Sequence, residues 1–333
     1  MPDPTKETRR IDPEIRRLIG RSAALLAALF IMLALLISAA LPVETVRLVY
    51  TVAQPGLPQR TAEPSPAPAP TADPTLVIRL ADVDKDVDPE VIIRLINVER
   101  GGGVELAGSE PRVLIYHTHD SEAYRQTPDS TYTPSGNCRT EDNTRNVYAV
   151  GEELKRILEE DYGIIAVHAD EKHEKPLITT AYSRSLDTML YYKNLYPTIE
   201  MFIDLHRDGV ADTGYEDDFV TVDGLECARM MFVVGTGKSG RTSQYGPEET
   251  EGVAAESPDF ESNYALARSL TEQLLSVNGR FMRNIRVKSG KYNQQVSSSC
   301  LLVEVGHNGN TLEQAKNSMR FLARAIANLD NGK

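Results

Sequence analysis

Three short stretches of the sequence place histidine and acidic residues directly after apolar runs that are typical of buried strands. They are residues 115–124, 203–208 and 301–310. The carboxyl ends of parallel strands meet at one edge of an α/β sheet, so we expect these imidazoles and carboxylates to share one crevice. Histidine nitrogens and a carboxylate oxygen are the usual protein ligands of a hydrolytic zinc site. The sequence therefore predicts a zinc-dependent hydrolase.

Two histidines occupy equivalent places at the ends of predicted strands. His117 and His206 each follow an apolar run, and we predict both as metal ligands. His119 stands two residues beyond His117, and an extended backbone would direct both imidazoles to the same side. The Asp-Ser pair that follows indicates that the chain is already turning. We therefore predict His117 as the ligand, and His119 as a residue that supports the ligands or contacts substrate.

The carboxylate ligand has three candidates. Glu122 lies five residues after His117 and can reach back from the loop. Glu141 and Asp142 stand just before a predicted helix, where acidic side chains also cap the helix N-terminus. Glu122 is the predicted ligand, and the other two stay open as alternatives.

A glutamate interrupts the otherwise apolar strand predicted at 300–305. A carboxylate in such a place must be neutralised, paired or directed into a polar cleft, and the cleft is the interpretation that we favour for Glu304. Glu304 would act as general base, taking a proton from the attacking water and delivering it to the leaving amine. The alternative is a structural ion pair with an arginine such as Arg207.

The remaining polar residues near these strand ends have weaker assignments. Arg207 and His307 are predicted to bind substrate or to support the metal ligands from the same edge. His168 and His173 follow the second strand, where a surface loop is the default interpretation.

The elements that would position these residues alternate between apolar strands and amphipathic helices. Strands are expected at 112–116, 164–167, 199–205, 230–234 and 300–305, and helices at 143–160, 178–194, 260–277 and 312–329. This order implies a mixed, mostly parallel sheet with helices on both faces. We predict one α/β domain over residues 111–330.

Upstream of this domain the sequence predicts a membrane anchor. Residues 22–41 are apolar or small and uncharged, and a helix of that length spans about 30 Å, the thickness of a bilayer core. A cleaved signal peptide is the alternative. Six basic residues within 1–21 predict a cytoplasmic tail. The predicted location is the cell membrane, with a single span and an extracytoplasmic catalytic domain.

Residues 42–110 are predicted to form an extracytoplasmic linker and a lead-in to the domain. Seven prolines between residues 54 and 75 favour an extended spacer. Residues 22–333 carry 30 basic against 44 acidic side chains, a net charge of −14, which argues against nucleic acid as a partner. The cysteines Cys138, Cys227 and Cys300 show neither metal-binding spacing nor a disulfide framework.

The chain resembles the stage II sporulation protein P amidases, relatives of the zinc-dependent N-acetylmuramoyl-L-alanine amidases. The likeness covers most of residues 111–329. It rests on the motifs YHTHDSEAY at 116–124, RT at 139–140 with DN at 142–143, AYSRSL at 181–186, IDLHRD at 203–208, FVVG at 232–235 and EVGHNGNTL at 304–312. The chain departs from the family pattern at His307, where a small residue or Asn is usual, and at 295–300, where a run with a histidine is expected.

This resemblance implies an amidase_3-like fold, Zn²⁺ as cofactor and peptidoglycan as substrate. The bond cut would be the amide between N-acetylmuramic acid and the L-alanine of the stem peptide. Activity of some members toward peptide crosslinks keeps a zinc endopeptidase or carboxypeptidase as an alternative, and a non-catalytic wall-binding scaffold is another. The resemblance also implies action during engulfment in sporulation, with a lytic transglycosylase like stage II sporulation protein D as partner.

Overall fold

The computed structural model describes residues 83–98, 103–210, 218–239, 241 and 257–330, apart from Asp86 and Asp88. The membrane span predicted at 22–41 and the proline-rich spacer lie outside these residues. Among the helices that are described, none is both long and apolar enough to cross a membrane.

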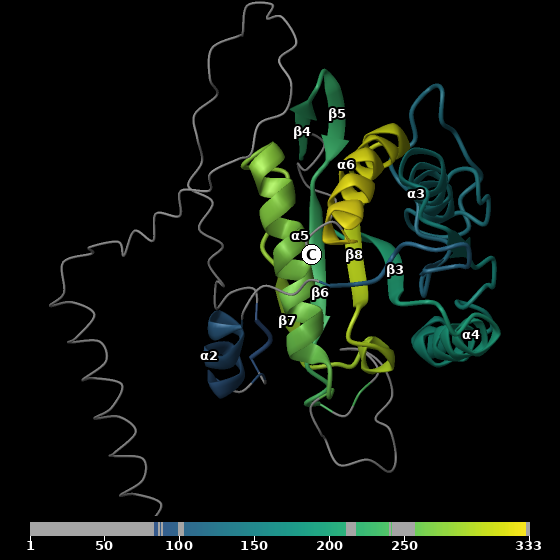
Figure 1. Cartoon of the computed structure of the whole chain (residues 1–333). Helices are drawn as coiled ribbons and strands as arrows, with labels where there is room; N and C mark the ends of the chain where they lie inside the picture. Colours follow the sequence, from purple (N-terminus) through teal and green to yellow (C-terminus); the bar gives the residue numbers. More distant parts are fainter. Residues whose placement is uncertain are drawn as a thin grey trace, which may run out of the picture. The chain divides into compact units, whose positions relative to one another are not determined.

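A six-stranded sheet organises the described part of the chain, in the order β2-β1-β3-β8-β6-β7 (Figure 1). The strands are β1 (Val113–Tyr116), β2 (Ala166–His168), β3 (Met201–Asp208), β6 (Met230–Gly235), β7 (Arg286–Lys288) and β8 (Cys300–His307). The first four in the sheet order run parallel. β6 is antiparallel to β8, and β7 runs parallel to β6. The mixed, mostly parallel sheet predicted from the sequence is confirmed.

Helices cover both faces of this sheet. They are α2 (Pro89–Asn97), α3 (Val147–Tyr162), α4 (Ala181–Leu195), α5 (Phe260–Val277) and α6 (Leu312–Asp330). Helices α3, α5 and α6 lie over one face, with α6 between the other two (Figure 1). Helix α4 packs on the opposite face, where its Met189 meets apolar residues of β1 and β3.

Side chains alternate between the two faces of the sheet along the three central strands, and this alternation decides on which face each candidate site residue lies. The odd-numbered apolar residues of β1, β3 and β8 belong to the main core under α3, α5 and α6, whereas even-numbered residues face α4. His206 and Glu304 are even-numbered and therefore share the α4 face. His117, the first residue beyond β1, continues the odd-numbered row on the other face.

Local signals explain where the helices begin and end. The helix predicted to start at residue 143 begins at Val147, because the side chain of Asn146 accepts a hydrogen bond from the backbone N–H of Tyr148. It ends at Gly163, whose φ of 67° is the left-handed conformation that favours glycine. The helix at 260–277 has the predicted bounds.

Two parts of the fold differ from the sequence expectations. Residues 91–96, which fall within the linker and lead-in predicted over 42–110, lie in helix α2, and Val91 and Leu95 are buried in the main core. Leu106 is buried there as well, so the packed unit begins upstream of the boundary predicted at residue 111. A hairpin of β4 (Phe219–Val222) and β5 (Leu225–Ala228) was not predicted.

Candidate active site at the sheet edge

A group of imidazole and acidic side chains lies at the carboxyl edge of β1, β3 and β8, on the face that α4 covers. The members are His119, Glu122, Asp204, His206 and Glu304. His206 and Glu304 are direct partners in the register of the parallel β3–β8 pair, which places their side chains next to each other on this face. We refer to these five residues as the edge group.

His206 is held between two carboxylates. Its Nε2 lies 2.9 Å from Asp204 Oδ1, and its Nδ1 lies 3.4 Å from Glu122 Oε2. Burial lowers the pKa of His206, but the charges of Asp204 and Glu122 outweigh burial and raise the pKa well above its ordinary value. Asp204 is itself fixed by Thr118, whose backbone N–H and hydroxyl donate to it at 2.8 and 2.6 Å. The imidazole of His206 is therefore held by the charges of two carboxylates, and its Nε2 has no aligned hydrogen bond among the described residues.

Glu122 is ionised although it is buried. Its Oε2 accepts a hydrogen bond from the backbone N–H of Arg207 at 3.0 Å, and Arg139 lies 3.6 Å from its Oε1. Burial raises the pKa of Glu122, but the hydrogen bond and charge of His206, with the charges of Arg207 and His119, hold it well below its usual range. Glu122 thus presents an anionic oxygen beside His206, as the sequence prediction of a carboxylate ligand requires.

The two alternative carboxylates are engaged elsewhere. Glu141 is exposed and pairs with Lys175 at 2.6 Å. Asp142 accepts hydrogen bonds from the backbone N–H and the hydroxyl of Thr144, at 3.0 and 2.7 Å. Neither contact directs a carboxylate into the edge group.

Glu304 differs from the other carboxylates of the edge group. Its buried Oε2 has no hydrogen-bond partner among the described residues. Burial raises its pKa to about 8, with Glu122 and Asp208 adding to the rise and His206 opposing it. The alternative of an ion pair with Arg207 does not occur in this structure, because that guanidinium donates to the carbonyls of Ala123 and Cys138.

His119 enters the edge group from the turn after β1. Its ring centroid lies 5.4 Å from that of His206 and 5.8 Å from that of Tyr182 on α4, both in edge-to-face arrangements. Its Nδ1 lies 3.2 Å from Oε1 of Glu174, in the loop that follows β2. A residue predicted to play a supporting part is therefore a central member of the group.

The structure does not bring His117 to the edge group, which corrects its predicted role as a ligand beside His206. The Nδ1–H of His117 donates to the carbonyl of Leu205 at 2.7 Å, and its Nε2 lies 2.8 Å from His168 Nε2. The physical reason is the place of the turn. The chain turns over residues 118–121, so His117 keeps the strand direction toward α3 and His119 is carried to the α4 face.

Arg207 and His307 do not face the edge group with their polar side-chain atoms. The guanidinium of Arg207 donates to backbone carbonyls, and the backbone N–H of Arg207 donates to Glu122. The Nδ1 of His307 accepts a hydrogen bond from the backbone N–H of Gly309 at 2.9 Å, and its Nε2 lies 3.8 Å from Asp218. Both residues stabilise loops around the site in this structure.

Sequence reasoning missed two carboxylates of this region. Asp204 lies in an apolar strand, the same signal that identified Glu304, so the sequence could have revealed it. Glu174 has no such signal, because it stands in a polar loop. His168 and His173, expected on a surface loop, have their ring nitrogens in contacts with other parts of the protein.

The donor set fits zinc in kind, although the described residues contain no three His, Cys, Asp or Glu side chains already close enough to form a metal site. Two imidazoles and a carboxylate are a common catalytic zinc set. His206 Nδ1 and Glu122 Oε2 are 3.4 Å apart, so both could bind one ion. The buried Oε2 of Glu304, which has no hydrogen-bond partner among the described residues, fits a carboxylate that faces a ligand.

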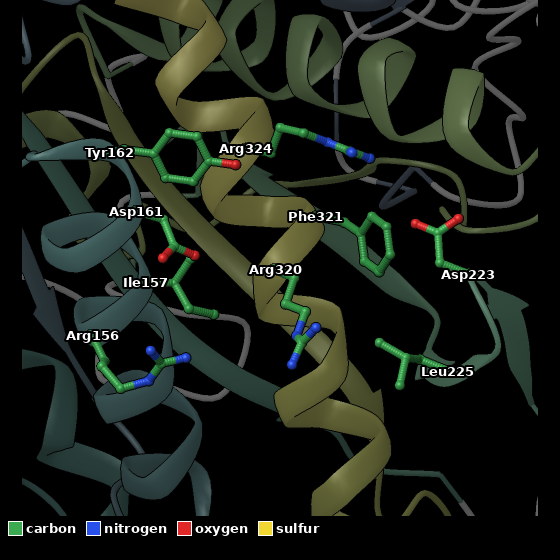
Figure 2. Close-up of a pocket in the computed structure, with 9 residues that line it drawn as sticks. All are labelled: Arg156, Ile157, Asp161, Tyr162, Asp223, Leu225, Arg320, Phe321 and Arg324. Carbon is green, nitrogen blue, oxygen red and sulfur yellow. The ribbon is translucent and has the colours of Figure 1, made fainter. Parts of the chain in front are cut away.

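A separate pocket of about 540 Å³ lies between α3, α6 and the β4–β5 hairpin (Figure 2). Its lining residues are Arg156, Ile157, Asp161, Tyr162, Asp223, Leu225, Arg320, Phe321 and Arg324. None of the residues of the edge group lines it, so this pocket is distinct from the candidate active site.

Several solved amidase structures are similar to this chain. Ami1 of Mycobacterium smegmatis, an N-acetylmuramyl-L-alanine amidase, has 12% identity and a TM-score of 0.36 over 69% of this chain and 100% of its own. The catalytic domain of CwlV, an N-acetylmuramoyl-L-alanine amidase from Bacillus (Paenibacillus) polymyxa var. colistinus, has 13% identity and a TM-score of 0.35, over 66% of this chain and 95% of its own.

Sequence comparison identifies the family. Stage II sporulation protein P of Bacillus subtilis (strain 168) is 25% identical over 280 residues, which are 80% of this chain. The match spans 61% of that relative's length. The profile of the stage II sporulation protein P (SpoIIP) family matches residues 61–327, which is most of the chain. The chain belongs to the stage II sporulation protein P family.

Proposed function

We propose that this chain is a membrane-anchored, zinc-dependent peptidoglycan hydrolase that acts in sporulation. The bond cleaved is the amide between N-acetylmuramic acid and the L-alanine of the stem peptide. The observation that carries the proposal is the convergence of His119, Glu122, His206 and Glu304 on one face of the sheet edge. Membership in the stage II sporulation protein P family supports the biological setting.

Three of these residues would hold the ion. His119, Glu122 and His206 supply two imidazoles and a carboxylate, and the remaining position is left for water or substrate. When bound, Zn²⁺ would polarise the scissile carbonyl and lower the pKa of water to about 7. Asp204 orients His206 from the far side of its ring, as carboxylates behind metal-binding histidines commonly do.

Glu304 is the proposed proton carrier. Its carboxylate accepts a proton from the attacking water as the new C–O bond forms at the scissile carbonyl. It then delivers this proton to the nitrogen of L-alanine as the C–N bond breaks, so the amine leaves neutral. The burial that raises its pKa to about 8 suits the second step. A cation beside it would lower that pKa and favour the first step.

The test is metal analysis together with product analysis on the full-length chain. The expected result is zinc in the wild type, and stem peptides with a free N-terminal L-alanine after digestion of peptidoglycan. His119→Ala and His206→Ala should lose zinc. Glu304→Gln should keep zinc and lose hydrolysis by about 10²- to 10⁴-fold. Wild-type hydrolysis by Glu304→Gln would refute the mechanism.

His117→Gln is the matched control for the histidine assignment. His117 lies on the other face of the sheet, so we expect this variant to retain zinc.

Cleaved crosslinks in place of free L-alanine would identify an endopeptidase. Wall binding without zinc or hydrolysis would identify a scaffold.

The anchor and the partner are further parts of the proposal. Residues 22–41 would fix the chain in the membrane, and residues 54–75 would hold the domain away from it. A lytic transglycosylase like stage II sporulation protein D is the proposed partner, since it would cut the glycan that this chain strips of peptides. Fractionation of cells that express the chain with and without residues 22–41 tests the anchor.

A further inference from the structure

The loop after β2 is fastened to the turn that carries His119. His173 in this loop is buried; its Nδ1–H donates to the carbonyl of His117 at 2.7 Å, and its Nε2 lies 2.8 Å from the hydroxyl of Thr188. The backbone N–H groups of His173 and Glu174 donate to Oδ1 of Asp120, at 2.9 and 3.1 Å. The loop therefore forms a fixed wall of the site.

Glu174 projects from this wall toward His119. Its Oε1 lies 3.2 Å from His119 Nδ1, and its side chain is only 11% exposed. The Ser121 hydroxyl and the Arg139 guanidinium donate to the same carboxylate. Nδ1 of His119 has no aligned hydrogen-bond partner among the described residues, so its contact with Glu174 is one of charge and proximity. The Arg139 guanidinium pairs with the Glu174 carboxylate and favours its ionised form. Glu174 therefore places a negative charge beside one particular nitrogen of His119.

We infer that Glu174 is a positioning residue, which keeps the ring proton of His119 on Nδ1 and thereby presents the Nε2 lone pair to the metal. A neutral imidazole carries one ring proton, and an anionic acceptor beside Nδ1 decides which nitrogen has it. Carboxylates placed in this way fix the tautomer and the ring orientation of metal-binding histidines. This inference rests on the proposed function, because it assigns His119 as a ligand.

Arg139 joins this positioning carboxylate to the ligand carboxylate. One guanidinium nitrogen contacts Glu174, and the other lies 3.6 Å from Oε1 of Glu122. Without the cation, two buried anions would repel each other across the turn. Arg139 therefore allows Glu122 and Glu174 to be ionised together on the two sides of His119.

The experiment compares Glu174→Gln and Glu174→Ala with the wild type, as full-length protein in detergent. Glu141→Gln is the matched control, because it removes a nearby glutamate that pairs only with exposed Lys175. Competition with a chelator measures the dissociation constant for zinc. Long-range ¹⁵N–¹H NMR of histidine-labelled, metal-free protein reports the His119 tautomer, with the signal assigned by its loss in His119→Asn.

We expect zinc binding to weaken about 10- to 100-fold in Glu174→Ala, and by a smaller factor in Glu174→Gln, which keeps a neutral acceptor. The His119 proton should move toward Nε2 in both variants, whereas Glu141→Gln should match the wild type. An unchanged tautomer and unchanged zinc affinity in Glu174→Gln would overturn the inference. If Glu174→Ala fails to fold, the Gln variant, which keeps the side-chain length, decides.

The two proposals fail in different ways. A wild type that binds no zinc contradicts the proposed function, and the tautomer in the metal-free protein still tests the pairing of Glu174 with His119. A wild type that binds zinc, with Glu174 variants that bind it equally well, contradicts only the positioning role.

Discussion

At the scale of single residues, the carboxylates of the edge group differ in the direction in which their pKa values are shifted. Glu122 and Asp204 lie against His206, and their pKa values are held below the ordinary range against the effect of burial. Glu304 has an unpartnered oxygen, and burial raises its pKa to about 8. Carboxyl groups whose surroundings push their pKa values apart are suited to different tasks. In this site two would bind or orient, and the third would move the proton.

The raised pKa of Glu304 predicts how stability depends on pH. A folded-state pKa above the ordinary 4.5 means that the protonated form stabilises the fold below pH 4.5, and that this stabilisation is lost as pH rises toward 8. In the presence of a chelator, Glu304→Gln should therefore stabilise the protein more at pH 8 than at pH 5, by roughly 2–4 kcal/mol. Urea unfolding at both pH values measures this, and an equal effect at both would contradict it.

A second residue-scale prediction concerns the support of Asp204. Thr118→Val keeps the shape of the side chain but removes the hydroxyl that donates to Asp204 at 2.6 Å. The buried carboxylate would lose one of its hydrogen bonds, at a cost of about 1–3 kcal/mol. Thr198→Val is a suitable control, since its hydroxyl donates to the carbonyl of Pro111 near the opposite end of β1. An equal loss of unfolding free energy in both variants would show that the hydrogen bond from Thr118 to Asp204 adds nothing beyond an ordinary hydroxyl hydrogen bond.

At the scale of elements, helix α3 is fitted to the His117–His168 pair. A Cβ atom on Gly151 would stand 2.6 Å from His168 Nε2 and 2.9 Å from His117 Nε2. These atoms cannot approach so closely, so glycine permits the contact between α3 and the sheet. The two histidines are thus part of the packing that fixes β1 and β2 beneath the helix.

This packing predicts the outcome of Gly151→Ala. Alanine favours a helix over glycine by about 1 kcal/mol, but overpacking typically costs 1–3 kcal/mol, and here two rings must move. We expect net destabilisation. His168→Ala in the same chain should remove the collision and recover part of the loss, so the double variant should be more stable than the sum of the single effects. Strict additivity would show that the rings are not the obstacle.

Much of the fold could be predicted because the spacing of apolar residues in the long helices and strands matches the period of the structure that they form. The helix at 260–277 and five strands of the sheet follow their hydrophobic patterns, whereas the short strand β7 was not predicted. The β4–β5 hairpin also had a signal, since Asp223 and Gly224 have φ values of 52° and 78° and Asp-Gly is a strong hairpin dipeptide. Helix α2 could be recognised by the four-residue spacing of Val87, Val91 and Leu95.

The types of residue in the site could be predicted, but not which of two nearby histidines, His117 or His119, belongs to it. A strand-end motif cannot reveal at which residue the chain turns, and that one position decides whether His117 or His119 faces His206. The contribution of Glu174 depends on a loop whose position is fixed by tertiary hydrogen bonds, among them those of Asp120 and His173. Both facts arise from tertiary contacts, which a single sequence does not display.

At the scale of the whole molecule, the described residues before 111, which lie within 83–98 and 103–110, contribute to the main core. Val91 and Leu95 of α2 are 1% and 0% exposed, and they join the same core as β1, β3 and β8. The α/β domain therefore depends on residues that the sequence pattern assigned to a lead-in. A fragment that begins at residue 111 would lack part of its core.

Leu95→Ala tests this dependence. Removing a fully buried leucine side chain should reduce the free energy of unfolding by about 2–5 kcal/mol. Leu195→Ala is the matched control, since that leucine is 49% exposed, and its loss should change stability by about 0.5 kcal/mol or less. A small effect at Leu95 would mean that α2 is an independent appendage.

The sheet order has a consequence for when the proposed enzyme becomes active. β8 is the last of the described strands, yet it lies in the middle of the sheet between β3 and β6, and it carries Glu304. During synthesis the other described strands of the sheet emerge first, and the place between β3 and β6 is filled only when residues 300–307 follow. If Glu304 moves the proton as proposed, the site cannot be active before β8 has joined the sheet.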